Sequence, residues 1–222
     1  MSALVDVHDV TKRYRLGKLD VVALDGVTLT VESGEFLAVA GPSGSGKTTL
    51  LNLIGCLDRP TSGEIAIDGE AVATMSAGQQ ANLRAQKLGF IFQTFNLIPV
   101  LTAYENVEYP LLLRRGRADA ATRVRAALEQ VGLGDRAGHR PTELSGGQQQ
   151  RVAIARALVT DPVLVLADEP TANLDSKTGH EIVELMRALN RERRTTFIFS
   201  THDPRIMSAA DRVLEIGDGR LA

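Results

Sequence analysis

The amino-acid sequence predicts an α/β fold with a parallel core sheet, an antiparallel β layer near the N-terminus and a helical insertion. Three short apolar segments have the pattern of strands buried on both faces, and helical patterns separate them along the chain. Near the N-terminus, apolar and polar residues alternate instead, as in strands with one face in solvent. From residue 101 to about residue 136 the pattern is helical only. The three apolar segments are residues 36–40, 163–167 and 195–199.

The antiparallel layer is predicted from residues 3–10 and 21–31, where β-branched and aliphatic residues alternate with polar ones. Residues 11–20 between them are expected to form a polar, hairpin-like connection. Tyr14 lies in this connection, and its ring could stack on a base or simply pack on the edge of the sheet. The residues alone favour neither role.

The remaining elements follow from apolar periodicity and from turn residues. Asp68 and Gly69 form a hairpin signal after a short alternating strand, and Asp218 and Gly219 mark a last turn. Amphipathic and apolar stretches give the other helices and strands. Helices are predicted at residues 76–85, 146–159 and 178–190, and further strands at residues 65–67, 88–92 and 213–216.

Length and composition restrict the classes of protein to which this chain can belong. With 222 residues, 44% of them hydrophobic and 23% charged, the chain can bury a substantial core and is not expected to be disordered. A formal charge of -2 gives no overall attraction to nucleic acid, and we expect no nucleic-acid partner. The single cysteine, Cys56, fits a reducing compartment. We expect neither a secretion signal nor a membrane span, because no apolar stretch approaches the roughly 18 residues that a span needs.

The segment GPSGSGKTT, residues 41–49, fits the phosphate-binding pattern G-x-x-x-x-G-K-[ST]. A strand that ends in such a loop directs backbone N–H groups inward, and the following helix adds its positive end. Lys47 would reach the β- and γ-phosphates, and the Thr48 hydroxyl would bind Mg²⁺. A glycine-rich turn can be only a turn, but the register of the lysine and threonine and both flanking patterns favour nucleotide binding.

Polar residues suited to phosphoryl transfer follow the apolar strands directly. Ligands of a parallel sheet bind where the strands end at their carboxyl edge, so we expect these side chains to meet there. Asp168 would hold Mg²⁺, and Glu169 would accept a proton from the attacking water. Gln93 could contact the metal or the water, and His202 could donate a hydrogen bond to the γ-phosphate. Taken singly, each has an alternative as a cap, an ion pair or a structural histidine.

The segment LSGGQ, residues 144–148, is a second anion-binding element. A serine and two glycines at the start of a predicted helix present free N–H groups and the positive helix end. One chain therefore carries two half-sites for phosphate. A two-fold dimer arranged head to tail would join the glycine-rich loop of each copy to the LSGGQ segment of the other.

In its motifs and their order, the chain resembles the nucleotide-binding domain of an ABC transporter over essentially its whole length. The resemblance implies one domain, residues 1–222, with a helical subdomain at about residues 94–160 inserted in a RecA-like, P-loop NTPase core. It also implies a homodimer that closes on ATP and reopens after hydrolysis. The motifs are Walker A (residues 41–48), the Q-loop Gln93, the signature LSGGQ, Walker B with Asp168 and Glu169, the D-loop Asn173, Leu174 and Asp175, and the H-loop His202.

The resemblance assigns a role to each motif residue. Glu169 and His202 would be catalytic, and Tyr14 would stack on adenine. Ser145 and Gly147 would contact the γ-phosphate of the ATP that the partner subunit holds. The Mg²⁺ ligands would be Thr48, Gln93 and Asp168. ATP would be bound by Tyr14, Gly41, Ser43, Gly44, Ser45, Gly46, Lys47, Thr48, Thr49 and Gln93.

Phrases such as IGCLDRPTSGEI and LADEPTANLDS are similar to the exporter-type group, which includes lipoprotein-releasing, macrolide-exporting and cell-division ATPases. This resemblance implies a subunit at the cytoplasmic face of the inner (plasma) membrane that meets a transmembrane permease through the helical subdomain and Gln93. One departure, Ala172 before Asn173 where relatives often have glycine, leaves the catalytic positions intact.

Two other functions are alternatives to transport. An ATPase acting on nucleic acid or ribosomes would carry a long coiled-coil insertion or a second such domain, and this sequence has neither. A regulatory ATPase that signals through a membrane partner to cell-envelope enzymes has the same motifs, so the sequence leaves that alternative open.

Overall fold

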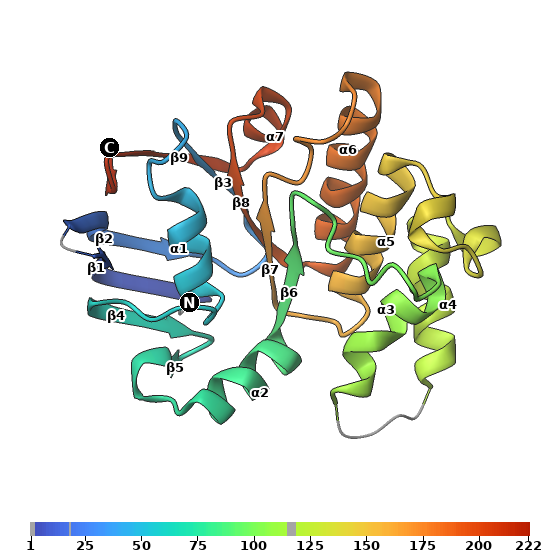
Figure 1. Cartoon of the computed structure of the whole chain (residues 1–222), viewed down its shortest axis with the longest axis horizontal. Coiled ribbons are helices and arrows are strands. Elements are labelled where there is room, and N and C mark those ends of the chain that lie inside the picture. The colour runs from blue at the N-terminus through green and yellow to red at the C-terminus, as the bar shows by residue number, and fades with distance from the viewer. Residues whose placement is uncertain (1–2, 18, 115–118) are drawn as a thin grey trace.

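The computed structural model describes residues 3–17, 19–114 and 119–222. Its strands form two sheets, which confirms the predicted α/β class (Figure 1). An antiparallel sheet has the order β2-β1-β4-β5, and a larger sheet has the order β10-β9-β3-β8-β7-β6. The antiparallel strands are β1 (Val5–Leu16), β2 (Leu19–Val31), β4 (Ser62–Ile67) and β5 (Glu70–Ala71). The larger sheet contains β3 (Phe36–Ala40), β6 (Leu88–Ile91), β7 (Leu164–Asp168), β8 (Thr196–Thr201), β9 (Arg212–Gly217) and β10 (Arg220–Leu221).

The strands β9, β3, β8, β7 and β6 run parallel, and only the short β10 is antiparallel to its neighbour β9. Helix α1 packs between the two sheets, and the other long helices lie on the far side of the parallel sheet or beyond its β6 edge (Figure 1). The helices are α1 (Lys47–Ile54), α2 (Ala77–Lys87), α3 (Ala103–Leu112), α4 (Ala120–Gln130), α5 (Gly146–Leu158), α6 (Ser176–Arg193) and α7 (Pro204–Ala209), with 3₁₀ turns at Val72–Thr74, Gly134–Arg136 and Pro141–Glu143.

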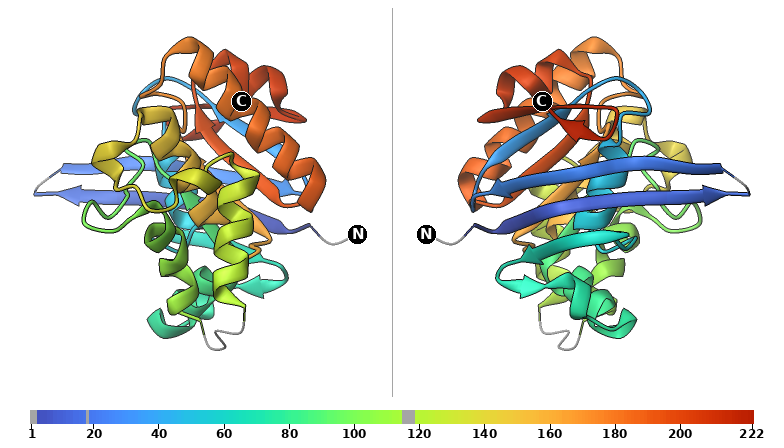
Figure 2. Two further views of the ribbon diagram at one scale, coloured as in Figure 1. Left: turned by 90° about the vertical axis from the view of Figure 1, so that its right-hand side faces the viewer. Right: turned by 90° about the vertical axis from the view of Figure 1, so that its left-hand side faces the viewer.

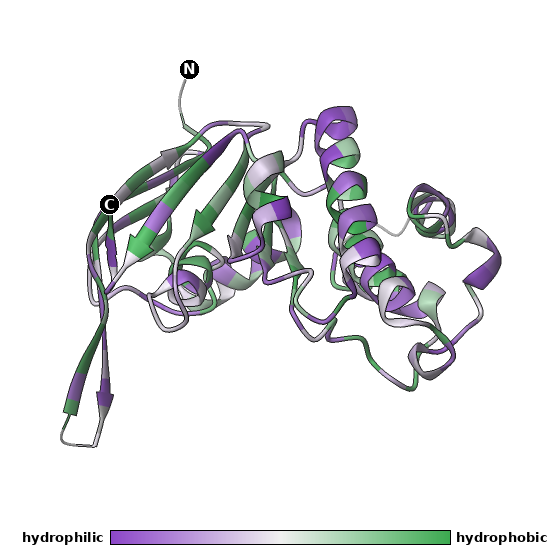
Figure 3. Ribbon diagram, turned by 90° about the horizontal axis from the view of Figure 1, so that it is seen from above, coloured by the Kyte–Doolittle hydropathy of each residue, from purple (hydrophilic) through white to green (hydrophobic). Residues whose placement is uncertain are grey.

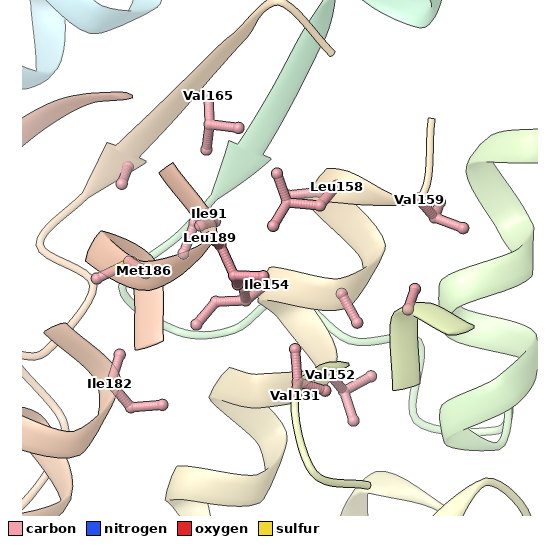
Figure 4. Close-up of a cluster of buried hydrophobic side chains, with 14 of the residues drawn as sticks. Ile91, Val131, Val152, Ile154, Leu158, Val159, Val165, Ile182, Met186 and Leu189 are labelled. Carbon is pink, nitrogen blue, oxygen red and sulfur yellow. The ribbon is translucent and has the colours of Figure 1, made fainter. Parts of the chain in front are cut away.

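The parallel sheet separates two hydrophobic cores. Successive side chains of a strand point to opposite faces, so Phe36 and Ala38 of β3 join one core while Leu37 and Val39 join the other. The first core includes Ile154 of α5 and Met186 of α6, packed against the sheet (Figure 4). The second lies between the sheet, α1 and the antiparallel layer. Both faces of β3 are therefore buried, which explains its continuous apolar sequence.

The exposed face of α6 is polar and its inner face is apolar, as Figure 3 shows. Asp175 is the N-cap of this helix and accepts a hydrogen bond from the N–H of Thr178 (3.0 Å), so the helix begins two residues before the predicted start. No helix within the described parts of the chain is long and apolar enough to cross a membrane.

The expected hairpin at residues 11–20 is present, but its connection is shorter than predicted, because β1 continues to Leu16 and β2 begins at Leu19. β1 and β2 continue as a two-stranded ribbon past the end of β4, and the ribbon projects beyond the rest of the molecule (Figure 2). Backbone hydrogen bonds pair the two strands whatever their side chains are, so the ribbon need not show alternating polarity. Lys18 lies outside the described residues.

The helical character of residues 101–136 is confirmed over α3 and α4, while residues 115–118 lie outside the described part. Thr102 and Glu105 form a capping box that starts α3. α5 contacts α3 and α4 as well as β6, so one helix joins the helical layer to the sheet. The limits of the helical subdomain at about residues 94–160 stay a prediction.

Candidate nucleotide-binding site

The glycine-rich loop fits between two backbone segments so closely that side chains would not be accommodated. A Cβ on Gly41 would lie 2.2 Å from the carbonyl oxygen of Ile216, and a Cβ on Gly46 would lie 2.5 Å from that of Ala23. Gly46 also has φ 108°, a conformation that favours glycine, and it caps α1 without a side-chain hydrogen bond. The first N–H groups of α1 are consequently available to an anion.

Lys47 lies across this loop and is buried. Its Nζ donates to the carbonyl oxygens of Gly41 (2.7 Å) and Pro42 (2.9 Å). The ammonium group is thus held at the mouth of the loop, where a phosphate can replace these carbonyls as its acceptor. This geometry fits the predicted role of Lys47.

The loop borders a cavity of about 680 Å³. Most of the predicted nucleotide-binding residues line it, although they come from separate elements. The sequence analysis missed the contribution of β2, whose exposed Val21 and Val22 have no nearby motif to mark them. The predicted residues that line the cavity are Gly41, Ser43, Gly44, Gly46, Lys47, Thr48, Thr49, Gln93, Glu169 and His202. The other lining residues are Val21, Val22, Ala23 and Pro42.

Thr48 and Asp168 meet although they are 120 residues apart in the sequence. The Thr48 hydroxyl lies 3.0 and 3.2 Å from the two carboxylate oxygens of Asp168. A hydroxyl and a carboxylate are oxygen donors of the kind that Mg²⁺ selects, and Mg²⁺ commonly takes one or two carboxylates together with substrate phosphates. The residues present therefore fit a magnesium ion at the edge of the cavity.

Glu169 follows Asp168 but points to a different partner. Its φ of 45° is unusual for a residue other than glycine, and its N–H donates to the carbonyl of Ser200 (2.9 Å). Its Oε1 lies 2.8 Å from Nδ1 of His202, so the ends of β7 and β8 bring the two predicted catalytic residues together. The His202 side chain is 72% exposed and that of Glu169 is 16% exposed, so the histidine can contact a ligand in the cavity.

Gln93 is exposed at the end of β6, and its carbonyl accepts a hydrogen bond from Nδ2 of Asn173 (2.8 Å). Asn173 belongs to the segment that follows Glu169. The bond therefore couples the segment after β6 to the segment after β7, and both border the site.

Ser145 and Gly147 are not among the residues that line the cavity. Ser145 caps α5: its Oγ accepts from the N–H of Gln148 (3.3 Å), while its own N–H donates to Oε1 of Gln148 (2.9 Å). A Cβ on Gly147 would lie 2.5 Å from Cγ2 of Thr178, so α5 and α6 approach closely here. Ser45 does not line the cavity either, and its Oγ is buried without a hydrogen-bond partner.

Asp203 is a buried carboxylate that the sequence analysis missed, although an aspartate before Pro204 is a recognisable helix start. It accepts hydrogen bonds from Thr171 and from Nε and Nη2 of Arg205 (2.9 and 2.6 Å). Burial raises its pKa, but the hydrogen bonds from Arg205 and Thr171 outweigh this and lower the pKa from 3.8 to about 2. The Asp203 carboxylate, through its hydrogen bond from Thr171, therefore connects the segment after Glu169 with the segment after His202.

A strand, phosphate loop and helix with a lysine over the loop, together with two adjacent acidic residues at the end of another strand of the same parallel sheet, define a P-loop nucleoside triphosphatase. The model of the family described as "ABC transporter" matches residues 24–172. The chain belongs to this family, as its motifs had indicated, and is an ATP-binding subunit with ATPase activity coupled to transport.

Relatives and solved structures agree with this assignment. The chain is 48% identical to the lipoprotein-releasing system ATP-binding protein LolD 1 of Rhodopseudomonas palustris over 225 residues, which is 100% of both chains. It is 49% identical to the macrolide export ATP-binding/permease protein MacB of Syntrophobacter fumaroxidans over 219 residues, 97% of this chain but 31% of MacB. The ATP-binding cassette MJ0796 of Methanocaldococcus jannaschii, solved as a post-hydrolysis dimer with ADP and phosphate, has a TM-score of 0.90 and 45% identity, covering 98% of this chain and 96% of MJ0796.

Replacing Lys47 by alanine is expected to weaken ATP binding by about tenfold or more, because it removes a charge-assisted hydrogen bond to phosphate worth roughly 1.5–3 kcal/mol. Titration calorimetry at fixed Mg²⁺ measures the change. Lys87→Ala is the matched control, since Lys87 pairs with Asp68 and Glu70 outside the cavity. Equal affinities for the Lys47 variant and the unmodified chain would contradict the placement.

The Asp203 network predicts a specific acid sensitivity. Its folded pKa is lowered from 3.8 to about 2, so its contribution to stability is present above the unfolded pKa and is lost as the pH falls toward 2. Between about pH 5 and about pH 3, the unmodified chain should lose about 1 kcal/mol more free energy of unfolding than Asp203→Asn. Urea unfolding at the two pH values measures this difference, and equal losses would refute it.

Proposed function

We propose that this chain is the ATP-hydrolysing subunit that drives a separate membrane protein of the lipoprotein-release or efflux type, through closure of a homodimer on ATP. The observation that carries the proposal is the separation of two phosphate-binding elements. The glycine-rich loop borders the cavity, whereas Ser145 and Gly147 at the start of α5 do not. A second copy related by a two-fold axis would supply the missing element to each site.

The MJ0796 relative supports this arrangement, because it has been solved as a dimer with ADP and phosphate. In the proposed closed dimer, Ser145 and Gly147 of the partner subunit bind the γ-phosphate over the loop. Hydrolysis removes that phosphate, and the two subunits separate. ATP binding would thereby hold the two subunits together, because the γ-phosphate contacts both half-sites.

The chemistry is divided among the strand ends. Thr48, Asp168 and Gln93 would hold Mg²⁺, which neutralises charge on the phosphates when it is bound. Glu169 accepts the proton of the attacking water, and His202 donates a hydrogen bond to the γ-phosphate. The short distance between Glu169 and His202 keeps the imidazole beside the carboxylate, so both act on the same terminal phosphate.

The membrane partner is proposed from the relatives. The chain matches only 31% of the MacB sequence, and MacB is an ATP-binding/permease protein. LolD 1, which it matches over its full length, is an ATP-binding protein of a lipoprotein-releasing system. We propose that the chain acts with a transmembrane permease at the cytoplasmic face of the membrane, which it contacts through the helical layer and the segment around Gln93.

Glu169→Gln is expected to bind ATP but hydrolyse it slowly, since an amide cannot accept the water's proton. The closed state should therefore accumulate, and size-exclusion chromatography with ATP and Mg²⁺ should show a dimer. The same variant with ADP is the control and should elute as without nucleotide. A monomer under both conditions would refute dimer closure. Should signalling through the membrane partner remain normal in this variant, the regulatory alternative would replace transport.

A further inference from the structure

Three side chains form a closed group beside the nucleotide cavity. Nζ of Lys12 lies 2.7 Å from Oδ1 of Asp58, and the Tyr14 hydroxyl lies 2.8 Å from Oδ2 of the same carboxylate. Nζ of Lys12 also lies over the Tyr14 ring, 4.7 Å from its centroid. The carboxylate therefore fixes both the edge of the ring and the cation that covers one of its faces.

The protonation states of the group support this geometry. Burial raises the pKa of Asp58, but the hydrogen bonds from Lys12 and Tyr14 outweigh it, and the net pKa is lowered. Burial and the bond to Asp58 raise the pKa of Tyr14. At neutral pH the carboxylate is charged and the phenol keeps its proton, so the tyrosine donates and the aspartate accepts. Lys12 also donates to the carbonyl of Arg59 (2.7 Å), which ties it to the same segment.

None of these three residues lines the cavity, but Tyr14 lies next to a residue that does. Tyr14 is the cross-strand neighbour of Val21, which lines the cavity. The projecting ribbon that carries both residues has lost the support of β4, whose last pair with β1 is Thr11 with Ser62 (Figure 2). Asp58 comes from the segment after α1, so it attaches this ribbon to the helix that begins at the glycine-rich loop.

We propose that Lys12 and Asp58 are positioning residues that hold the Tyr14 ring for stacking on the base of the bound nucleotide. The inference rests on the proposed role of Tyr14 at the base. Lys12 covers one face of the ring, and a planar base stacks on the opposite face. Without the carboxylate, the Tyr14 hydroxyl loses its acceptor and Lys12 loses its ion pair, so the ring can turn about its side-chain torsions and the stacking surface is no longer pre-arranged.

The test compares ADP with inorganic pyrophosphate, which has the two phosphates of ADP but lacks its base and ribose. Titration calorimetry with Mg²⁺ gives both dissociation constants for each variant. Tyr14→Ala should weaken ADP binding by about fivefold or more, the low end of base-aromatic stacking. Asp58→Ala and Tyr14→Phe should each weaken it by about threefold, because the ring remains but its hydroxyl is no longer held. Pyrophosphate affinity should stay unchanged in all three.

Glu70→Ala is the matched control, since Glu70 is a carboxylate of the same sheet that pairs with Lys87. It should change neither affinity. In the double variant Tyr14→Ala with Asp58→Ala, ADP binding should be no weaker than in Tyr14→Ala alone, because Asp58 acts through the ring.

Three results would overturn the proposal: unchanged ADP affinity in Asp58→Ala, an equal loss for ADP and pyrophosphate, or additive losses in the double variant. The equal loss would show that the group only supports the fold. Neither ligand requires hydrolysis or dimer closure, so these results are independent of the Glu169→Gln experiment.

Discussion

The close approach of the glycine-rich loop to two carbonyl oxygens is the constraint on which the site depends. Gly41 lies against Ile216 of the parallel sheet, and Gly46 lies against Ala23 of the antiparallel sheet. A side chain at either position would separate the loop from one sheet. The loop is therefore both the phosphate site and the contact that sets the two sheets relative to each other, and the valines of β2 reach the cavity for this reason.

Two adjacent carboxylates acquire different partners because the strand ends between them. Asp168 is the last residue of β7, and its side chain reaches Thr48. Glu169 has already left the strand with a positive φ, which turns its side chain to His202. In a regular strand, neighbouring side chains would point to opposite faces. The unusual backbone of Glu169 thus directs a general-base candidate into the cavity, beside a metal-ligand candidate, Asp168, that contacts the cavity-lining Thr48.

Those parts of the fold that depend on local pattern could be predicted from the sequence. The bounds of β3 were predicted to the residue, because a strand buried on both faces is a continuous apolar run. The end of α5 was predicted to within one residue, and the serine that caps it marked its start. The extension of β1 and β2 into residues 11–20 was not predicted, because backbone hydrogen bonds between strands do not require a particular side-chain pattern. α7 was missed because six residues are too few for periodicity. The helix-start signal at Asp203 did not indicate its bond to Thr171, and Asp58 carried no signal for its role, because both depend on contacts with residues distant in the sequence.

Helix α5 connects the LSGGQ segment, at its start, with the hydrophobic core, at its end. Its 13 residues extend about 20 Å, from the exposed Ser145 to the buried Leu158 beside β6 and β7. Near its start, the buried Gln150 donates to the carbonyl of Pro170 (2.7 Å), the residue directly after Glu169. For a helix of this length, a tilt of about 10° about its buried end would displace Ser145 by roughly 3 Å, comparable to the length of a hydrogen bond. A small rearrangement of the core near Leu158 would therefore be larger at Ser145, the residue that the proposed dimer places against the partner subunit's ATP.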